Sequence, residues 1–338
     1  MMKNFWNDVP RPFYALAPME AVTDVVFRHV VQKAAPPDVY FTEFTNATGW
    51  YRAGEKAIGG RLVKANDESP IAAQLWGSDP EAMAALATQC AVWGYDGIDI
   101  NMGCPDQSAI RGGGGAQMIR TPDVAAQIIA SAKESGLPVS VKTRLGYTHV
   151  DEWREWLTFL LHQDIAALTI HLRAERGMGQ VPGHFELIRE IKQLCDTVAP
   201  HTPRIINGDI HDRAHGQELA DTYGIDGVMI GRGIFANPYA FAKSNFDDGI
   251  SNIEGSMDEH ITSSKFETHK EKLINLLSYH LDQYDQYSEL TKRPFETLKR
   301  FFKIYIRDFD GASDLRTKLM NTHTTNEVRE LLKSHRHH

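Results

Sequence analysis

The stretch GIDINMGCPDQSAIRGGGGAQMIRTPDVAAQIIASAKESGLPVSVKTRLG, residues 97–146, contains one complete strand–helix–strand unit. Its two ends, 97–103 and 139–145, are apolar with little alternation, as expected of strands buried on both faces. Between them, Thr121 and Pro122 predict a helix that begins with proline in its first turn. Strands joined through a helix lie parallel in one sheet, with a right-handed crossover.

The same unit recurs through residues 1–243. The other apolar runs that predict strands are FYALAPM (13–19), VYFTEF (39–44), IAAQLW (71–76), ALTIHLR (167–173), RIINGDI (204–210) and GVMIGRG (227–233). Helix-start signals fall between them, at Asp79-Pro80 and at Asp212. Eight such units predict an α/β fold, a (β/α)₈ TIM barrel. An open doubly wound sheet is the alternative, but it would require a glycine fingerprint that LAPMEAVTD lacks.

Composition excludes several classes of protein. The 338 residues are 42% hydrophobic and 24% charged, with 36 basic and 44 acidic residues, which argues against a uniformly basic nucleic-acid-coating surface. The sequence contains no long apolar run and no signal peptide, so we expect no membrane association. The three cysteines, Cys90, Cys104 and Cys195, form no CxxC pair, which argues against a disulfide framework or a metal cluster. We expect a cytoplasmic monomer without a metal.

The chain divides unevenly after the barrel. Residues 244–267 are acidic and polar and predict a linker, whereas 268–338 contain amphipathic patterns that predict a small helical domain. The last 48 residues hold 11 basic and 6 acidic side chains, so this end is basic. Four of these side chains would form one face of a helix: Lys299, Arg300, Lys303 and Arg307. Such a face could bind phosphates or could simply be solvated.

Polar residues gather where the barrel strands end, which is the end that carries chemistry in this fold. Lys142 lies in a predicted inner strand, where a lysine has no structural value, so a site explains it better. Cys104 follows a strand between Gly103 and Pro105, and we expect it to be functional. Cys90 and Cys195 are expected to be buried hydrophobic residues. Glu43 could contact a substrate or hold the first loop.

Several short blocks resemble the tRNA-dihydrouridine synthases, in the same order and over roughly residues 10–243. The most specific is Asn101-Met102-Gly103-Cys104-Pro105, followed by Gly115-Ala116. The others are Leu16-Ala17-Pro18-Met19 with Thr23-Asp24, Gln74-Leu75-Trp76-Gly77, Val141-Lys142-Thr143-Arg144-Leu145-Gly146, His171-Leu172-Arg173, Asn207-Gly208-Asp209-Ile210 and Ile230-Gly231-Arg232-Gly233. The helical end resembles the C-terminal RNA-binding domain of that family, more loosely.

The resemblance implies a tightly bound FMN that NADPH reduces and a tRNA substrate whose uridines lose their 5,6 double bond. Hydride would pass from reduced FMN to C6 of the uracil, and Cys104 would be the catalytic acid that protonates C5. This role requires the thiol form of Cys104. Lys142 would lie beside the flavin ring and stabilise its anionic reduced form.

The resemblance also implies two sets of binding residues. The cofactor set is Pro18, Met19, Gln74, Lys142, His171, Asn207, Gly208, Asp209, Gly231 and Arg232. The substrate set is Asn101, Arg144, Arg173, Lys299, Arg300, Lys303 and Arg307. Asn101 could orient either the uracil or the flavin edge, and Arg144 could bind the base or a phosphate.

Two other classes of protein remain open at this point. One is a different FMN- or phosphate-binding barrel enzyme on a small molecule, either dihydroorotate dehydrogenase-like or a lyase that forms a Schiff base at Lys142. The other is an inactive RNA-binding barrel. The Cys104 loop and the basic C-terminal end favour an enzyme that acts on RNA.

Overall fold

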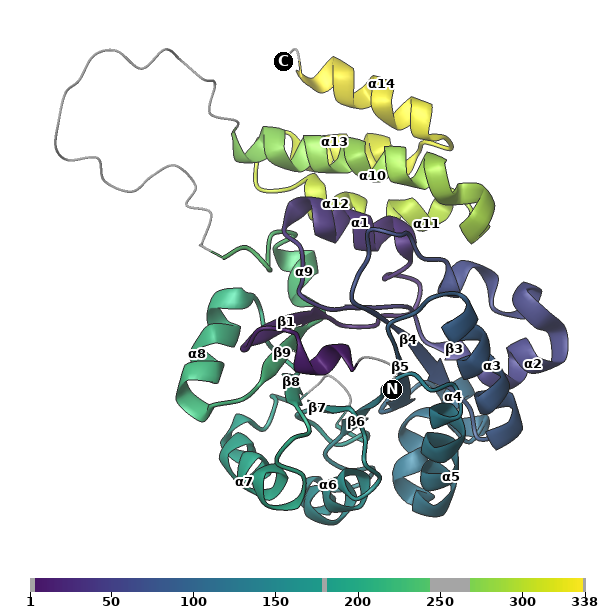
Figure 1. Cartoon of the computed structure of the whole chain (residues 1–338). Coiled ribbons are helices and arrows are strands. Elements are labelled where there is room, and N and C mark those ends of the chain that lie inside the picture. Colours follow the sequence, from purple (N-terminus) through teal and green to yellow (C-terminus); the bar gives the residue numbers. More distant parts are fainter. Residues whose placement is uncertain (1–3, 178–180, 244–267, 337–338) are drawn as a thin grey trace, which may run out of the picture.

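The computed structural model describes residues 4–177, 181–243 and 268–336, and its core is a barrel of parallel strands (Figure 1). The strands are β1 (Phe13–Leu16), β2 (Tyr40–Phe41), β4 (Ile71–Trp76), β5 (Gly97–Met102), β6 (Val139–Arg144), β7 (Ala167–His171), β8 (Arg204–Asn207) and β9 (Gly227–Ile230). Their order is β1-β9-β8-β7-β6-β5-β4-β2, and a bridge between Ala15 and Val39 joins the two ends. The predicted TIM barrel is therefore confirmed and the open sheet is excluded.

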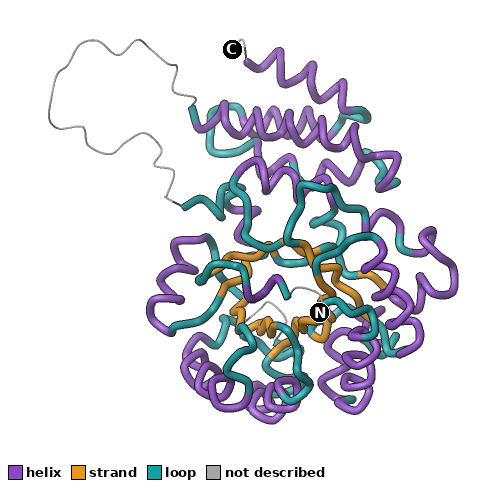
Figure 2. The backbone as a smooth tube through the Cα atoms, viewed as in Figure 1, coloured by secondary structure: helices purple, strands orange, loops and turns teal. Residues whose placement is uncertain are grey.

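A ring of helices covers the outside of the barrel (Figure 2). These are α1 (Val25–Ala34), α3 (Pro80–Val92), α5 (Pro122–Lys133), α6 (Trp153–Leu161), α7 (Ile188–Val198) and α8 (Arg213–Tyr223). The predicted helix-start residues are N-caps: Asp79 accepts the amide hydrogens of Glu81 and Ala82 in α3, and Asp212 accepts that of His215 in α8. Shorter elements occupy the connections: β3 (Thr45–Asn46), α2 (Ala47–Ala53), α4 (Gln107–Arg111) and α9 (Gly233–Ala236).

The N-terminal end of the barrel is filled by aromatic side chains. Trp6 is 1% exposed, and its ring lies 5.6 Å from that of Phe13 and 6.3 Å from that of Phe41. The inward residues of several strands complete this cluster. The interior is thus a packed core at this end, and space for a ligand remains at the other end.

The C-terminal helices lie on the barrel beside α1 (Figure 1). They are α10 (His269–Thr291), α11 (Glu296–Lys299), α12 (Phe302–Tyr305), α13 (Ala312–Met320) and α14 (Thr325–Arg336). Phe27 of α1 stacks on Phe301, with ring centroids 4.7 Å apart. The buried His280 ring shares a hydrogen bond of 2.8 Å with the Tyr305 hydroxyl. Apolar packing therefore joins the helices to the barrel.

The prediction of one basic helical face over residues 299–307 is wrong. The chain forms two single turns there, α11 and α12, with Arg300 and Phe301 between them. The break between the two turns comes from backbone hydrogen bonds to the third residue back, from Phe301 N to Leu298 O and from Ile304 N to Phe301 O. Arg300 and Arg307 turn toward the barrel, where they donate to the carbonyl oxygens of Ala21 (2.9 Å) and of Phe235 (3.3 Å).

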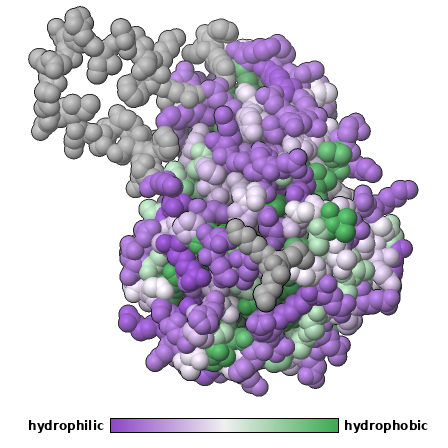
Figure 3. Space-filling model, in the orientation of Figure 1, coloured by the Kyte–Doolittle hydropathy of each residue, from purple (hydrophilic) through white to green (hydrophobic). Residues whose placement is uncertain are grey.

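The surface of the described chain is mostly hydrophilic on the face in Figure 3. The large hydrophobic side chains that are exposed come from separate elements: Tyr51, Val92, Val181, Leu290 and Met320. Among the described helices, none is both long enough and apolar enough to cross a membrane. The predicted linker, 244–267, lies outside the described residues.

Candidate functional site

A cavity of about 450 Å³ opens at the C-terminal ends of the barrel strands. Nine of the ten residues predicted to bind the cofactor line it: Pro18, Met19, Lys142, His171, Asn207, Gly208, Asp209, Gly231 and Arg232. Of the other lining residues, Ala17, Ile210 and Gly233 stand in the motif blocks but had no assigned role, and the sequence did not indicate His211 and Ala236. The motifs therefore located the loops but not every lining residue.

Gln74 is the exception, because it is not among the residues that line this cavity. Its side chain is fully buried, where Nε2 donates to Asp99 at 2.7 Å and Oε1 accepts from Asn101 at 3.0 Å. Both polar atoms of the amide are thus bound to protein. We therefore describe Gln74 as a support of the cavity floor.

One side of the cavity is built to receive an anion. Gly208 has a φ of 111°, and a Cβ there would lie 3.4 Å from Arg173 Nη1 and 3.5 Å from His171 Nε2. Arg173 Nη1 and His171 Nδ1 are both buried and have no hydrogen-bond partner in the described chain. Because buried polar groups are nearly always satisfied, these two atoms indicate a ligand, and the Arg173 nitrogen calls for an acceptor on it.

Asp209 organises the cations around that position. Its carboxylate accepts from Arg173 Nη2, from the Gly183 amide at 3.1 Å and from Arg232 Nη2 at 3.4 Å. Burial acts to raise the pKa of Asp209, but the Gly183 amide and Arg173 outweigh it and the pKa is lowered. Asp209 is therefore a carboxylate at neutral pH. Arg232, whose side chain is 67% exposed, remains able to bind an anion from the open side.

Two cavity residues on neighbouring strands, Lys142 of β6 and His171 of β7, differ in charge. Burial and then the repulsion of Lys142 hold the pKa of His171 well below its usual value, so the imidazole is neutral. Burial, followed by repulsion from Arg144, lowers the pKa of Lys142 to about 8, and attraction by Asp99 opposes this. At neutral pH, Lys142 is mainly protonated and points a positive charge into the cavity.

Cys104 lies on the loop between β5 and α4, at the same end of the barrel. Its backbone amide donates to Asn101 Oδ1 at 2.9 Å, and Asn101 pairs in register with Lys142 on β6. Burial raises the pKa of the Cys104 thiol. The thiol is therefore protonated at neutral pH, which is the form that a proton donor needs. Cys90 and Cys195 are buried, as expected.

The predicted substrate residues near the barrel are largely enclosed. Arg144 is 8% exposed and donates through Nε to Gly103 O at 2.6 Å, so it supports the Cys104 loop. Arg173 is 2% exposed and donates to Val181 O and Asp209. Among the residues near the C-terminal helices, Arg300 and Lys303 are exposed, and Lys299 and Arg307 are partly exposed.

Glu43 is a buried contact between the barrel and the helices. Its carboxylate accepts from Arg293 Nη2 at 2.6 and 2.7 Å and from the Ala21 amide. Burial raises the pKa of Glu43 to about 7, although Arg293 acts against this. Of the two roles left open for Glu43, this geometry favours holding the first loop. Arg293 was missed because its partner is 250 residues away.

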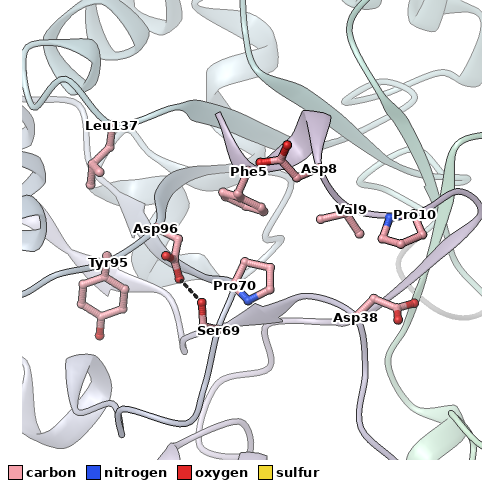
Figure 4. A pocket seen from close by; sticks show the side chains of 10 residues that line it. All are labelled: Phe5, Asp8, Val9, Pro10, Asp38, Ser69, Pro70, Tyr95, Asp96 and Leu137. Atoms are coloured by element: carbon pink, nitrogen blue, oxygen red, sulfur yellow. Dashed lines mark hydrogen bonds between the residues drawn. The ribbon is translucent and has the colours of Figure 1, made fainter. Parts of the chain in front are cut away.

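A second cavity, of about 510 Å³, lies at the opposite, N-terminal end of the barrel (Figure 4). Its wall combines Phe5, Val9 and Pro10 with carboxylates that include Asp96. Asp96 accepts from the Ser69 hydroxyl at 3.2 Å and from the Ile71 amide at 2.8 Å. None of the described side-chain atoms that are buried without a partner belongs to its lining residues.

An eight-stranded barrel with a cationic cavity at the loops after its last two strands is the arrangement of a TIM-barrel enzyme. Within the described residues, no group of three or more His, Cys, Asp or Glu side chains could hold a metal ion. The family description "Dihydrouridine synthase" matches residues 15–337, and the chain belongs to that family.

Curated relatives are similar over nearly their whole length. A "Probable tRNA-dihydrouridine synthase 2" of Bacillus subtilis (strain 168) is 54% identical, covering 98% of this chain and 96% of that protein. A "Probable tRNA-dihydrouridine synthase" of Staphylococcus aureus (strain COL) is 51% identical, covering 98% of this chain and 95% of that protein. A solved structure, a variant of NCR from Zymomonas mobilis, covers 67% of this chain and 83% of its own at 18% identity, with a TM-score of only 0.38.

Proposed function

We propose that the chain is a tRNA-dihydrouridine synthase, which reduces the 5,6 double bond of uridines in tRNA. The observation that carries the proposal is the Cys104 thiol, kept protonated by burial at the same barrel end as a cavity with unsatisfied donors. The family membership favours this function over the small-molecule oxidoreductase and the Schiff-base lyase. It also favours an active enzyme over an inactive RNA-binding barrel.

The cavity fits FMN in size and in donor chemistry. Its volume lies in the usual range for cofactor sites. The phosphate end would lie beside Gly208. Arg232, Arg173 Nη1 and His171 Nδ1 would hold it there. Lys142 would stand beside the ring, with Pro18 and Met19 against it. Bound there, FMN reduced by NADPH would supply the hydride for C6 of the uracil.

The protein's own residues would manage the proton and the base. Cys104 would deliver its thiol proton to C5, and the pKa raised by burial keeps that proton available. Asn101 would act through its hold on the Cys104 amide, and Arg144 through Gly103. The target base must leave the tRNA stack to reach this depth.

We further propose that residues 1–243 are the catalytic domain, 244–267 a linker and 268–338 the tRNA-binding domain. Lys303 and Arg300 are exposed and available for phosphate contacts, although one Arg300 nitrogen donates to Ala21 O, whereas Arg307 is partly buried and bonded to Phe235 O. The surplus of basic residues in the last 48 positions supports RNA binding at this end. A cytoplasmic monomer remains the expectation.

The test is an assay of the purified chain with NADPH and total tRNA from cells that lack this gene. We expect the protein to bind FMN and to form dihydrouridine, detected by nucleoside mass spectrometry. Cys104→Ala should keep the flavin and lose the product. A protein that takes up no FMN, or a Cys104→Ala variant with full activity, would contradict the proposal.

A further inference from the structure

An aspartate lies in the middle of the barrel, directly beneath the cavity floor. Asp99 is a fully buried residue of β5 and the only charged one in that strand. Burying a carboxylate is costly unless it is hydrogen-bonded. Asp99 meets this requirement with two partners from the adjacent strands: Ser140 Oγ donates to Oδ1 at 2.6 Å, and Gln74 Nε2 donates to Oδ2 at 2.7 Å.

These hydrogen bonds continue from Asp99 to the Cys104 loop. Gln74 Oε1 accepts from Asn101 Nδ2 at 3.0 Å, and Asn101 Oδ1 accepts the amide hydrogens of Gly103 (3.1 Å) and Cys104 (2.9 Å). A carboxylate can only accept, so Gln74 must turn its NH₂ group toward Asp99 and its oxygen toward Asn101. Asn101 must then present its oxygen to the Cys104 amide. Asp99 thus fixes the orientation of both side-chain amides, Gln74 and Asn101, in this series of hydrogen bonds.

Asp99 also affects the charge on the flavin side of the cavity. Its partner Ser140 precedes Lys142 by two residues, so both β6 side chains are on the face of the strand that meets Asp99. The charged and titratable groups around Lys142 are Asp99, Arg144, Cys104 and His171. The attraction of Asp99 counters the repulsion from Arg144 and the cost of burial, and so favours the ammonium form of Lys142.

We infer that Asp99 is a positioning residue for both halves of the site: it orients the Gln74–Asn101 amides that hold the Cys104 loop, and it keeps the charge on Lys142. The role of Asp99 in catalysis rests on the proposed function. The geometry itself requires neither flavin nor tRNA, so it can be tested separately.

Asp99→Asn separates the two effects. The new amide can donate to Ser140 Oγ, whose hydroxyl can donate instead to Ile98 O, 3.3 Å away, while the remaining oxygen still accepts from Gln74. The hydrogen-bond chain would therefore survive, but the negative charge would be lost. Gln74→Met has the opposite effect, because it cuts the chain and retains the carboxylate.

The readouts are taken on the full chain, with and without FMN. The first is hydrogen exchange of the Cys104 amide, and the second is the NMR titration of the Lys142 side chain. We expect Asp99→Asn to move the Lys142 titration to lower pH by about one unit and to leave Cys104 protection unchanged. Gln74→Met should lower Cys104 protection about tenfold, as expected for one lost hydrogen bond.

Asp96→Asn, at the other end of the barrel, is the matched control and should change neither readout. Asp99→Leu should change both, but its loss of two buried partners can prevent folding, so the two milder variants carry the test. An unshifted Lys142 titration in Asp99→Asn, or wild-type Cys104 protection in Gln74→Met, would overturn the inference. If these readouts behave as expected but the wild-type protein makes no dihydrouridine, the proposed function fails and the positioning role stands.

Discussion

The two ends of the barrel each carry a cavity of similar volume, but their polar groups differ. At the N-terminal end, Asp96 is satisfied by Ser69 and Ile71. At the C-terminal end, Arg173 Nη1 and His171 Nδ1 are buried without partners and Lys142 carries a lowered pKa. The N-terminal cavity also contains a perturbed group, because burial raises the pKa of Tyr95. The contrast therefore rests on the cations and the unpartnered atoms gathered at the C-terminal cavity.

The largest effect on ligand affinity should come from removing a cation at the C-terminal cavity. Arg232→Met should weaken FMN binding roughly 10- to 100-fold, since a hydrogen bond to a charged group contributes about 1.5–3 kcal/mol. Quenching of FMN fluorescence measures the affinity. Arg52→Met, an exposed arginine of α2, is the control. Unchanged FMN affinity in Arg232→Met would contradict the view that the C-terminal cavity, and not the N-terminal one, binds the anion.

A second prediction concerns the attachment of the helices to the C-terminal end. Arg293→Ala should lower the free energy of unfolding by about 2 kcal/mol at pH 8, because it leaves the buried Glu43 unpaired. The pKa of Glu43 is about 7, so at pH 6 the carboxyl is mostly protonated and needs no cation. The loss should therefore be smaller at pH 6.

Urea denaturation at the two pH values checks this difference. Arg154→Ala breaks the exposed pair with Glu190 and is the control, with a loss below about 1 kcal/mol at both pH values. An equal loss at pH 6 and pH 8 for Arg293→Ala would show that Glu43 does not titrate in this range.

The third prediction is a gain in stability at the reactive end. The pKa of Lys142 falls from 10.5 to about 8 in the folded chain, so the unfolded chain binds its proton more tightly. The resulting penalty on folding is complete below pH 8 and is lost as the pH rises from 8 to the unfolded value. Flavin-free Lys142→Met should be more stable than wild type by about 1–2 kcal/mol at pH 7. The gain should shrink as the pH approaches 10. Lys56→Met, at an exposed lysine, should show no such trend.

The smallest effect is expected at the N-terminal cavity. Ser69→Ala removes one hydrogen bond to Asp96 and should cost less than about 1 kcal/mol. Dihydrouridine formation and FMN affinity should equal those of the wild type. A large loss of either one would mean that this cavity also takes part in the reaction.

The barrel was predictable because each strand is a short, almost unbroken apolar run followed by a helix signal. The cavity loops were predictable because their motifs follow those runs directly. The division of residues 299–307 into two turns was not predictable, because the backbone there bonds to the third residue back, from Phe301 N to Leu298 O and from Ile304 N to Phe301 O. The i, i+4 spacing of the basic residues carries no sign of this change in backbone hydrogen bonding.

Asp99 and the Glu43–Arg293 pair were missed for another reason. In both cases the structural role of a charged side chain depends on a partner far away in the sequence: Ser140 for Asp99 and Arg293 for Glu43. No local pattern encodes such a contact. A charged residue within a buried strand is the available signal: it drew attention to Lys142, and Asp99 carries the same signal.

The most direct test of the account is to measure the two half-reactions separately. Wild type and Cys104→Ala, both loaded with FMN, are reduced by NADPH without oxygen and then mixed with tRNA that lacks dihydrouridine. We expect equal rates of flavin reduction by NADPH. Flavin reoxidation by tRNA should be slower in Cys104→Ala by roughly 10²- to 10⁴-fold, the usual contribution of a general acid. Equal reoxidation rates would contradict the assignment of Cys104 and the reaction site built around it.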